Sequence, residues 1–278
     1  MGLEGKITTL ELTDTGRVRD HNEDAVATDI GVGLLVLADG MGGYSAGEVA
    51  SEIAMKTVIQ MVQERVKQED RVDIDFETGL TRQSIVLRDA ILRANKLIHQ
   101  TAQTRPQCEG MGTTVVTCLF WDNRVSIAHV GDSRMYRFRD GRFTQLTRDH
   151  SLLQELVSRG FYSREEAERS LNRNYVTRAL GVESTVEVEI QEETVHPGDV
   201  YVLCSDGLSD MVRDQDIHLT ISTFSASLEE MGQQLLQLAN DNGGRDNISM
   251  ILAQVTKTFA APKQGGLMNK IAGWARLN

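Results

Sequence analysis

The sequence predicts an α+β fold built on antiparallel β-sheets. Short segments rich in apolar and β-branched residues cluster before and after a central region, and that region contains two long segments with helical periodicity. A later helical segment is followed by one final strand. Clustered strands and clustered helices, without a regular alternation of the two, favour antiparallel sheets over a parallel sheet with crossover helices.

Eight segments are predicted to be strands because they are apolar or β-branched over five to eight residues and are bounded by polar or glycine-containing turns. They are residues 7–12, 32–38, 113–120, 124–130, 134–138, 186–190, 199–204 and 248–255. Several of these segments are continuously apolar, which indicates strands that are buried on both faces.

Three segments have the spacing of an amphipathic helix, residues 45–66, 80–102 and 228–238. Each is predicted to bury one apolar face against the core. The faces are Ala46, Val49, Ala50, Ile53, Thr57 and Met61 in the first segment, Leu87, Ile91, Ala94 and Ile98 in the second, and Leu228, Met231, Leu235 and Leu238 in the third.

Two further regions interrupt this pattern. Residues 149–181 are polar and helix-prone, and we interpret them as a mobile insertion over a functional edge. We predict that residues 1–256 form the domain and that residues 257–278 form a linker and a short amphipathic tail. That tail is either a frayed end or short helix packed on the domain, or a docking helix for a membrane surface or a partner protein.

Composition excludes several classes of protein. The chain has 278 residues, of which 40% are hydrophobic and 25% charged, as expected of a globular protein and not of a disordered one. Its net charge of −11 gives no basic footprint, so nucleic acid is not an expected partner. No stretch has the approximately 18 apolar residues of a membrane span, and the first residues do not resemble a signal peptide.

Cysteine content bears on the compartment. The three cysteines, Cys108, Cys118 and Cys204, are too few and too scattered for a disulfide framework, which favours a reducing cytoplasm. Nothing suggests a coiled coil, so a monomer is expected.

Three apolar segments end in an aspartate beside a glycine, at Asp39, Asp132 and Asp206. One such pair is more often a hairpin turn than a ligand. Three together, each after a buried strand, place several carboxylates at the edge of the core, where each is costly unless a positive charge compensates it. Hard cations such as Mg²⁺, Mn²⁺ and Ca²⁺ prefer oxygen ligands, so the pattern predicts a divalent metal site.

Two more clusters extend this set. One lies near the start of the chain and contains Arg19, Asn22, Glu23 and Asp24. In the other, Asp246 and Asn247 directly precede the last expected strand. His129 and His150 are also candidates, although a histidine near a strand end is more often structural than catalytic.

Eight motifs now occur in a fixed order, GRVRDHNED, VLADGMGG with AGEVAS, GMGTTVV, AHVGDSRMYRFRDG, LTRDHS, VTRALG, VLCSDGLSD and GGRDNIS. Together they resemble the bacterial branch of the metal-dependent protein phosphatases, the type 2C Ser/Thr phosphatases, over about residues 7–255. The resemblance implies an αββα sandwich of two antiparallel sheets with a two-metal site at one end, and residues 149–181 correspond to the flap of that family.

The resemblance also implies roles for the acidic residues. Asp39 corresponds to the carboxylate that bridges both metals, and Gly40 to the residue that offers its carbonyl oxygen. The other implied ligands are Asp206 and Asp246 for the second metal, Glu23 and Asp24 for metal-bound waters, and Asp132 with Asp206 for a third, weaker metal. Asp24 is implied to lie near the attacking water, and Arg19 to hold the substrate phosphate.

The implied activity is hydrolysis of phosphoserine and phosphothreonine monoesters by a water or hydroxide that bridges two Mn²⁺ or Mg²⁺ ions. The expected partners are phosphorylated proteins and a cognate Ser/Thr kinase. Met41 stands where eukaryotic members have a histidine that resembles a general acid, so the proton would come from a metal-bound water or from another side chain, with His129 and His150 as candidates.

Two alternatives belong to other classes of protein. A catalytically silent relative would bind phosphoproteins or regulatory partners, but such relatives usually lose a metal ligand. A Ca²⁺-binding module is disfavoured because the sequence has no EF-hand spacing.

Overall fold

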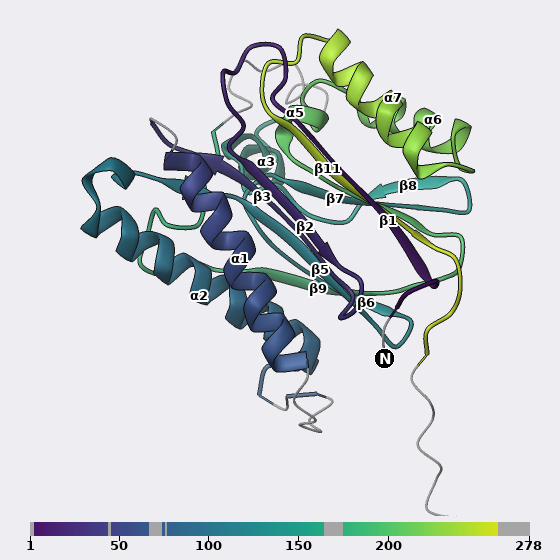
Figure 1. The fold of residues 1–278 in the computed structure, drawn as a ribbon, viewed down its shortest axis with the longest axis horizontal. Helices are drawn as coiled ribbons and strands as arrows, with labels where there is room; N and C mark the ends of the chain where they lie inside the picture. The colour runs from purple at the N-terminus through teal and green to yellow at the C-terminus, as the bar shows by residue number, and fades with distance from the viewer. Residues whose placement is uncertain (1–2, 44–45, 67–73, 76, 164–174, 261–278) are drawn as a thin grey trace, which may run out of the picture.

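Two antiparallel sheets lie face to face in this chain, and helices cover their outer faces (Figure 1). The computed structural model describes residues 3–43, 46–66, 74–75, 77–163 and 175–260. Nearly all of the predicted tail, residues 261–278, and the middle of the predicted flap, residues 164–174, lie outside the described residues.

The first sheet has the order β1-β11-β10-β7-β8. Its strands are β1 (Ile7–Asp14), β7 (Arg134–Arg139), β8 (Arg142–Gln145), β10 (Val200–Cys204) and β11 (Ile248–Val255). Every pairing is antiparallel, and the chain's first strand therefore lies beside its last.

The second sheet has the order β2-β3-β5-β6-β9, with the short strand β4 (Gly112–Thr113) paired to the end of β3. Its other strands are β2 (Asp24–Asp29), β3 (Leu34–Met41), β5 (Val115–Trp121), β6 (Arg124–Val130) and β9 (Glu189–Thr194). These pairings are also antiparallel, which confirms the predicted αββα sandwich.

Two pairs of helices form the outer layers. The helices α1 (Ala46–Val66) and α2 (Arg82–Thr104) cover the second sheet, and α6 (Asp214–Thr223) and α7 (Leu228–Asp241) cover the first (Figure 1). Three short helices complete the described part, α3 (Leu152–Ser158), α5 (Asp206–Ser209) and a 3₁₀ turn, η1 (Pro106–Cys108). No helix among the described residues is long and apolar enough to cross a membrane.

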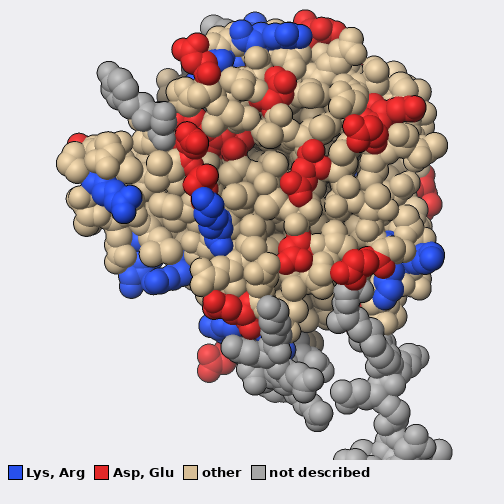
Figure 2. Space-filling model, viewed as in Figure 1, with Lys and Arg blue, Asp and Glu red and all other residues tan. Residues whose placement is uncertain are grey.

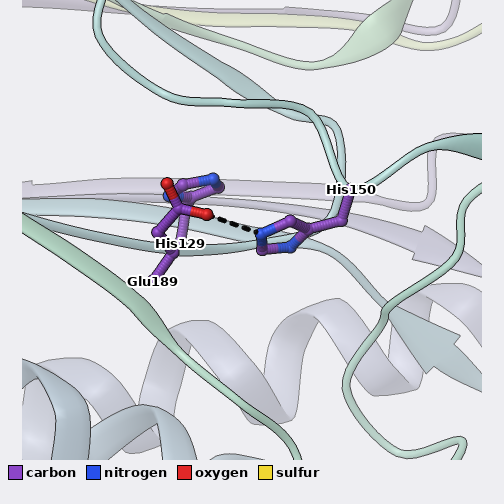
Figure 3. Close-up of side chains that lie close together, drawn as sticks. All are labelled: His129, His150 and Glu189. Carbon is purple, nitrogen blue, oxygen red and sulfur yellow. Dashed lines mark hydrogen bonds and ion pairs between the residues drawn. The ribbon is translucent and has the colours of Figure 1, made fainter. Parts of the chain in front are cut away.

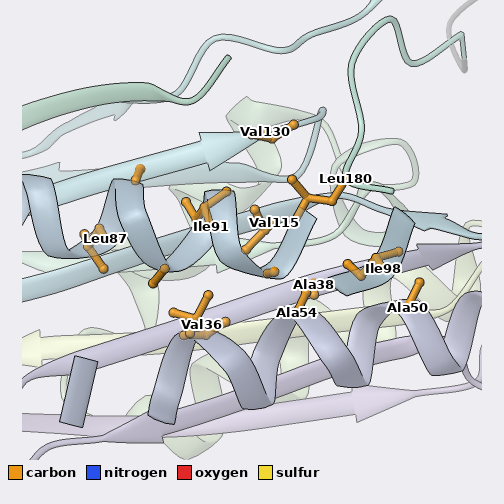
Figure 4. Packing of buried hydrophobic residues seen from close by; sticks show 14 of the residues in the cluster. Val36, Ala38, Ala50, Ala54, Leu87, Ile91, Ile98, Val115, Val130 and Leu180 are labelled. Carbon is orange, nitrogen blue, oxygen red and sulfur yellow. The ribbon is translucent and has the colours of Figure 1, made fainter. Parts of the chain in front are cut away.

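The position of strand β3 explains why its sequence is continuously apolar. Leu34, Val36 and Ala38 face the layer of α1 and α2, where Figure 4 shows Val36 and Ala38 beside the helices. The alternate residues Leu35 and Leu37 face the core between the two sheets. Because both faces of β3 are buried, the strand carries Asp39 into the interior edge of the sandwich.

Most predicted elements are confirmed, with three corrections. In α1 the buried residues include Ala54, Val58 and Val62, whereas Thr57 and Met61 are only partly buried, so the predicted face was partly wrong. The predicted strand at 186–190 is displaced to Glu189–Thr194. Strands β2 and β8 and helices α5 and α6 were missed, because none of them has a long apolar run.

The predicted stripe of α2 is confirmed, since Leu87, Ile91, Ala94 and Ile98 are all fully buried. In α7, Leu228, Met231 and Leu235 are buried, and Leu238 packs against the same cluster. An unbroken periodicity of 3.6 residues was sufficient to predict both faces.

Candidate metal centre

Asp24 and Asp39 are directly opposite each other on neighbouring strands. The register of β2 on β3 pairs these two residues, and side chains in that relation have Cβ atoms about 4.5–5.5 Å apart. Thr114 fixes Asp39 further, because its Oγ1 accepts the Asp39 N–H at 3.2 Å and its own N–H donates to the Asp39 carbonyl at 2.8 Å. Two like charges in this arrangement are destabilising unless a cation lies between them.

The first sheet contributes Asp206 and Asp246 to the same region. Asp206 is the first residue of α5, directly after β10, and Asp246 precedes β11. Ser205 links the two sheets, since its hydroxyl donates to Asp24 Oδ2 at 3.0 Å and accepts the Ser249 N–H at 3.0 Å. Loops from both sheets therefore meet at one end of the sandwich.

Asn247 holds the loop between β1 and β2 in place. Its Oδ1 accepts the Glu23 N–H at 2.8 Å, and its Nδ2 donates to the carbonyl oxygens of Thr15 and His21 at 3.1 and 3.0 Å. The loop carries Arg19 and Glu23. The sequence analysis placed Asn247 in an acidic cluster without a role, and only the folded structure shows this positioning.

The glycine at 207 permits a close approach of two backbones. A Cβ at this position would lie 1.9 Å from the Asn247 carbonyl oxygen, so the start of α5 can contact the start of β11 only without a side chain. This contact brings Asp206 and Asp246 to the same end of the sheet. Gly40 makes a related link, because its N–H donates to the Glu23 carbonyl at 3.2 Å.

We expect Gly207→Ala to lower the free energy of unfolding by about 1–3 kcal/mol, because the backbone must move to admit the methyl group. Gly43→Ala is the matched control, since its Cβ would meet no atom within 4 Å. Urea denaturation of the two variants measures the difference. Equal stabilities would show that the approach of α5 to β11 is not tightly constrained.

Burial is the main cause that raises the pKa values of the aspartates in this cluster. Burial, followed by the charges of Asp24, Asp206 and Asp132, raises the pKa of Asp39 well above its ordinary value. Burial and the neighbouring Asp132 act in the same way on Asp206, while burial raises the pKa of Asp24 to about 7 and of Asp132 to about 6. The charges that raise the pKa values of Asp39 and Asp206 include, for both, those of Asp24, Asp132 and Asp246, as expected of one acidic cluster.

An unpaired atom shows that these residues fit a cation. Glu23 Oε1 is buried and has no hydrogen-bond partner, although His21 Nε2 lies 3.5 Å away. A buried carboxylate oxygen without a partner is costly, and hard divalent cations bind such oxygens. The set of donor atoms, all oxygens, fits Mg²⁺ or Mn²⁺.

Arg19 lies beside this cluster. Its Nη2 donates to Asp246 Oδ2 at 2.7 Å, and its side chain is 51% exposed. That hydrogen bond, together with the charges of Asp246, Glu23 and Asp206, raises the guanidinium pKa. The guanidinium is thus held at the rim of the acidic centre with part of its surface available to a ligand from solvent.

A second group of potential ligands lies behind the turn that carries Asp132. Nitrogen and oxygen atoms of His129, His150 and Glu189 lie within 4.8 Å of one another (Figure 3). The His129 Nε2–H donates to the Arg148 carbonyl at 2.8 Å, and the two imidazole rings stack with centroids 4.8 Å apart.

The hydrogen bonds of this second group do not favour a metal. His150 Nδ1 accepts the Gly131 N–H at 3.0 Å, so the proton of the neutral ring is on Nε2, which faces Glu189 Oε2 at 3.2 Å. His129 and His150 are only 2% and 7% exposed, so neither ring is placed to meet a substrate from solvent. The structure therefore gives no support to either as a general acid.

Comparison with known proteins agrees with this geometry. Residues 16–253 match the family model described as protein phosphatase 2C, and the chain belongs to that family. It is 37% identical over 262 residues to the serine/threonine protein phosphatase PstP of Mycobacterium tuberculosis, covering 94% of this chain and 47% of PstP. The chain thus spans about half the length of that relative.

Two further comparisons cover whole proteins or domains. A putative protein phosphatase 2C-type of Streptococcus pyogenes is 39% identical over 243 residues, which are 86% of this chain and 94% of that protein. The crystal structure of the PstP catalytic domain in complex with two manganese ions has a TM-score of 0.78 and 35% identity, covering 90% of this chain and 99% of that domain.

Proposed function

We propose that this protein is a metal-dependent Ser/Thr phosphoprotein phosphatase that hydrolyses phosphoric monoesters. The observation that carries the proposal is the convergence of acidic residues from both sheets around an unpaired buried oxygen of Glu23, with Arg19 at the rim. Membership of the protein phosphatase 2C family and the two manganese ions in the related PstP domain support it.

We assign the ligands of two Mn²⁺ or Mg²⁺ ions to the acidic cluster. Asp39 would be a ligand of both ions, Gly40 would offer its carbonyl oxygen, and Asp206 and Asp246 would be ligands of the second ion. Glu23 and Asp24 would hold bound waters, and Asp132 with Asp206 would hold a weaker third ion. When bound, such ions would lower the pKa of a water and neutralise phosphate charge.

Side chains of this protein would orient the attacking water and the substrate phosphate. Asp24 accepts a hydrogen bond from Ser205, which fixes its carboxylate where it would orient the attacking water. Arg19 would bind phosphate oxygens through its planar guanidinium. No cysteine takes part, because Cys108, Cys118 and Cys204 are all buried.

The test is hydrolysis of a phosphothreonine peptide by the purified protein after chelation, and again after addition of Mn²⁺ or Mg²⁺. We expect no release of phosphate without metal and restored release with it. A protein that binds Mn²⁺ but hydrolyses no phosphopeptide would instead be a catalytically silent member that binds phosphoproteins. No observation favours that second function, since every predicted ligand position retains its acidic residue.

The wider setting is also part of the proposal. We propose phosphorylated Ser/Thr proteins and a cognate kinase as partners, a monomer, and a cytoplasmic location, which three unpaired cysteines support. We also propose that residues 1–256 form the phosphatase domain, because the last described strand ends at Val255.

The surface charge bears on possible partners. The face in Figure 2 shows separate acidic and basic groups without a continuous basic patch among the described residues.

Arg19→Ala is expected to raise KM for a phosphopeptide by about 10-fold to 100-fold, with a smaller fall in kcat, because a charge-assisted contact to phosphate is lost. The KM of Arg19→Lys should lie between those of the wild type and Arg19→Ala, since lysine keeps the charge but lacks the planar pair of donors. Arg213→Ala is the control, an arginine with an 80% exposed side chain outside the centre. An unchanged KM in Arg19→Ala would remove this residue from phosphate binding.

A further inference from the structure

His150 makes two hydrogen bonds to the backbone of Gly131, the residue that precedes Asp132. The His150 N–H donates to the Gly131 carbonyl at 2.9 Å, and His150 Nδ1 accepts the Gly131 N–H at 3.0 Å. Both backbone polar groups of Gly131 are therefore bonded to one residue. The His150 carbonyl in turn accepts the Thr177 N–H at 2.8 Å.

Thr114 confines the same turn from the opposite side. Gly131 has a φ of +109°, a conformation that disfavours any side chain, and a Cβ there would lie 2.6 Å from the Thr114 side chain. The Thr114 hydroxyl also contacts Ser133 Oγ at 2.7 Å and accepts the N–H of Asp39. The turn is thus held between a residue that positions Asp39 and a histidine.

The surroundings of His150 select the tautomer that this contact requires. Glu189 Oε2 accepts a hydrogen bond from the His150 Nε2–H at 3.2 Å, so the proton of the neutral ring is on Nε2 and the lone pair is on Nδ1. Stacking on His129 fixes the plane of the ring. Burial lowers the pKa of His150 to about 4, so the ring stays neutral and Nδ1 remains an acceptor near neutral pH.

We propose that His150 is a positioning residue for the metal centre, whose Nδ1 holds the Gly131–Asp132 turn so that the Asp132 carboxylate faces Asp206. The inference rests on the proposed function, because it assigns Asp132 and Asp206 to a weakly bound additional cation. His150 touches neither substrate nor metal in this account. It acts only through the backbone of Gly131.

Two substitutions of His150 distinguish the role of Nδ1 from that of Nε2. In His150→Asn the amide oxygen can take the place of Nδ1 and accept the Gly131 N–H, whereas in His150→Gln the amide lies near the former Nε2 and that acceptor is lost. We expect the Mn²⁺ concentration that half-fills the weak class of sites to rise about 10-fold or more in His150→Gln and by less than about twofold in His150→Asn.

Direct binding gives a readout that does not depend on catalysis. Mn²⁺ titration followed by electron paramagnetic resonance should show the weak class of sites weakened by a similar factor in His150→Gln, with the tight class unchanged. Asp132→Asn is the reference and should lose the weak class. Equal shifts in the Asn and Gln variants, or no shift in either, would overturn the proposal.

Two variants of Glu189 give an independent test if His150→Gln does not fold. Arg178 Nη1 lies 3.3 Å from His150 Nε2, so in Glu189→Ala the donor from Arg178 remains and favours the opposite tautomer, with the proton on Nδ1. We expect Glu189→Ala to weaken the weak Mn²⁺ class and Glu189→Gln, which can still accept, to retain it. Identical binding by these two variants would contradict the tautomer argument. Wild-type hydrolysis decides the proposed function separately from all of these variants.

Discussion

Asp39→Asn is expected to reduce kcat for a phosphopeptide by about 10³-fold or more while leaving the metal-free protein at least as stable as the wild type. The loss in rate follows because metal assistance contributes several kcal/mol, and each 1.36 kcal/mol corresponds to tenfold. The metal-free variant should keep its stability because burial and the neighbouring Asp24 make an ionised Asp39 unfavourable, as its raised pKa shows. An asparagine of the same shape carries no charge and removes that cost.

Asp199→Asn is the matched control for this prediction. Asp199 is also buried, but Arg139 compensates its charge with a contact of 2.6 Å. Breaking a compensated buried pair costs about 3–5 kcal/mol, so this variant should lose stability and keep its response to Mn²⁺. Thermal unfolding with chelator and with Mn²⁺ measures both effects. A lower unfolding temperature of metal-free Asp39→Asn than of wild type would contradict the account.

The stability of the metal-free protein is expected to fall as pH rises from 6.5 to 8. The pKa of Asp24 is raised to about 7 and those of Asp39 and Asp206 are raised well above their ordinary value, whereas an unfolded aspartate has a pKa of about 3.9. The folded state therefore holds protons that the unfolded state has released. Each such proton lowers the free energy of unfolding by about 1.4 kcal/mol per pH unit until the folded group ionises.

The window from pH 6.5 to 8 isolates these carboxylates. The pKa values of His129 and His150 are lowered, so their contribution has the opposite sign but is complete above the ordinary histidine value of about 6.5. Saturating Mn²⁺ should flatten or reverse the fall, because a bound cation stabilises the ionised carboxylates. Urea denaturation at several pH values tests this. A metal-free stability that is constant or rises over the window would contradict the prediction.

The fold could be predicted wherever the pattern of the sequence was strong. The continuous apolar run of β3 and the unbroken stripe of α2 are confirmed as buried elements. Strand β2, with the sequence DAVATD, was missed because an edge strand that is only partly buried needs few apolar residues. In α1 the small residues Ala46, Ala50 and Ala54 are buried on one side, and small residues give a weak periodic signal.

The candidate site could be predicted only in part. The carboxylates at strand ends were visible as aspartates after apolar runs, and the register of β2 on β3 now places Asp24 opposite Asp39. The roles of Ser205, Asn247 and Thr114 could not be predicted, because each acts through hydrogen bonds between segments about 40 to more than 200 residues apart in the chain. His150 was visible as a histidine, but its contact with Gly131 depends on the folded turn.

The central claim is that carboxylates from both sheets form a binuclear metal centre. The most direct measurement is an anomalous difference map, recorded at the manganese absorption edge, from crystals of this protein grown with Mn²⁺. We predict two strong peaks about 3.5–4 Å apart, both within ligand distance of Asp39, with Asp206 and Asp246 on the second ion. A map with no peak at Asp39, or with its strongest peak among His129, His150 and Glu189, would contradict the account.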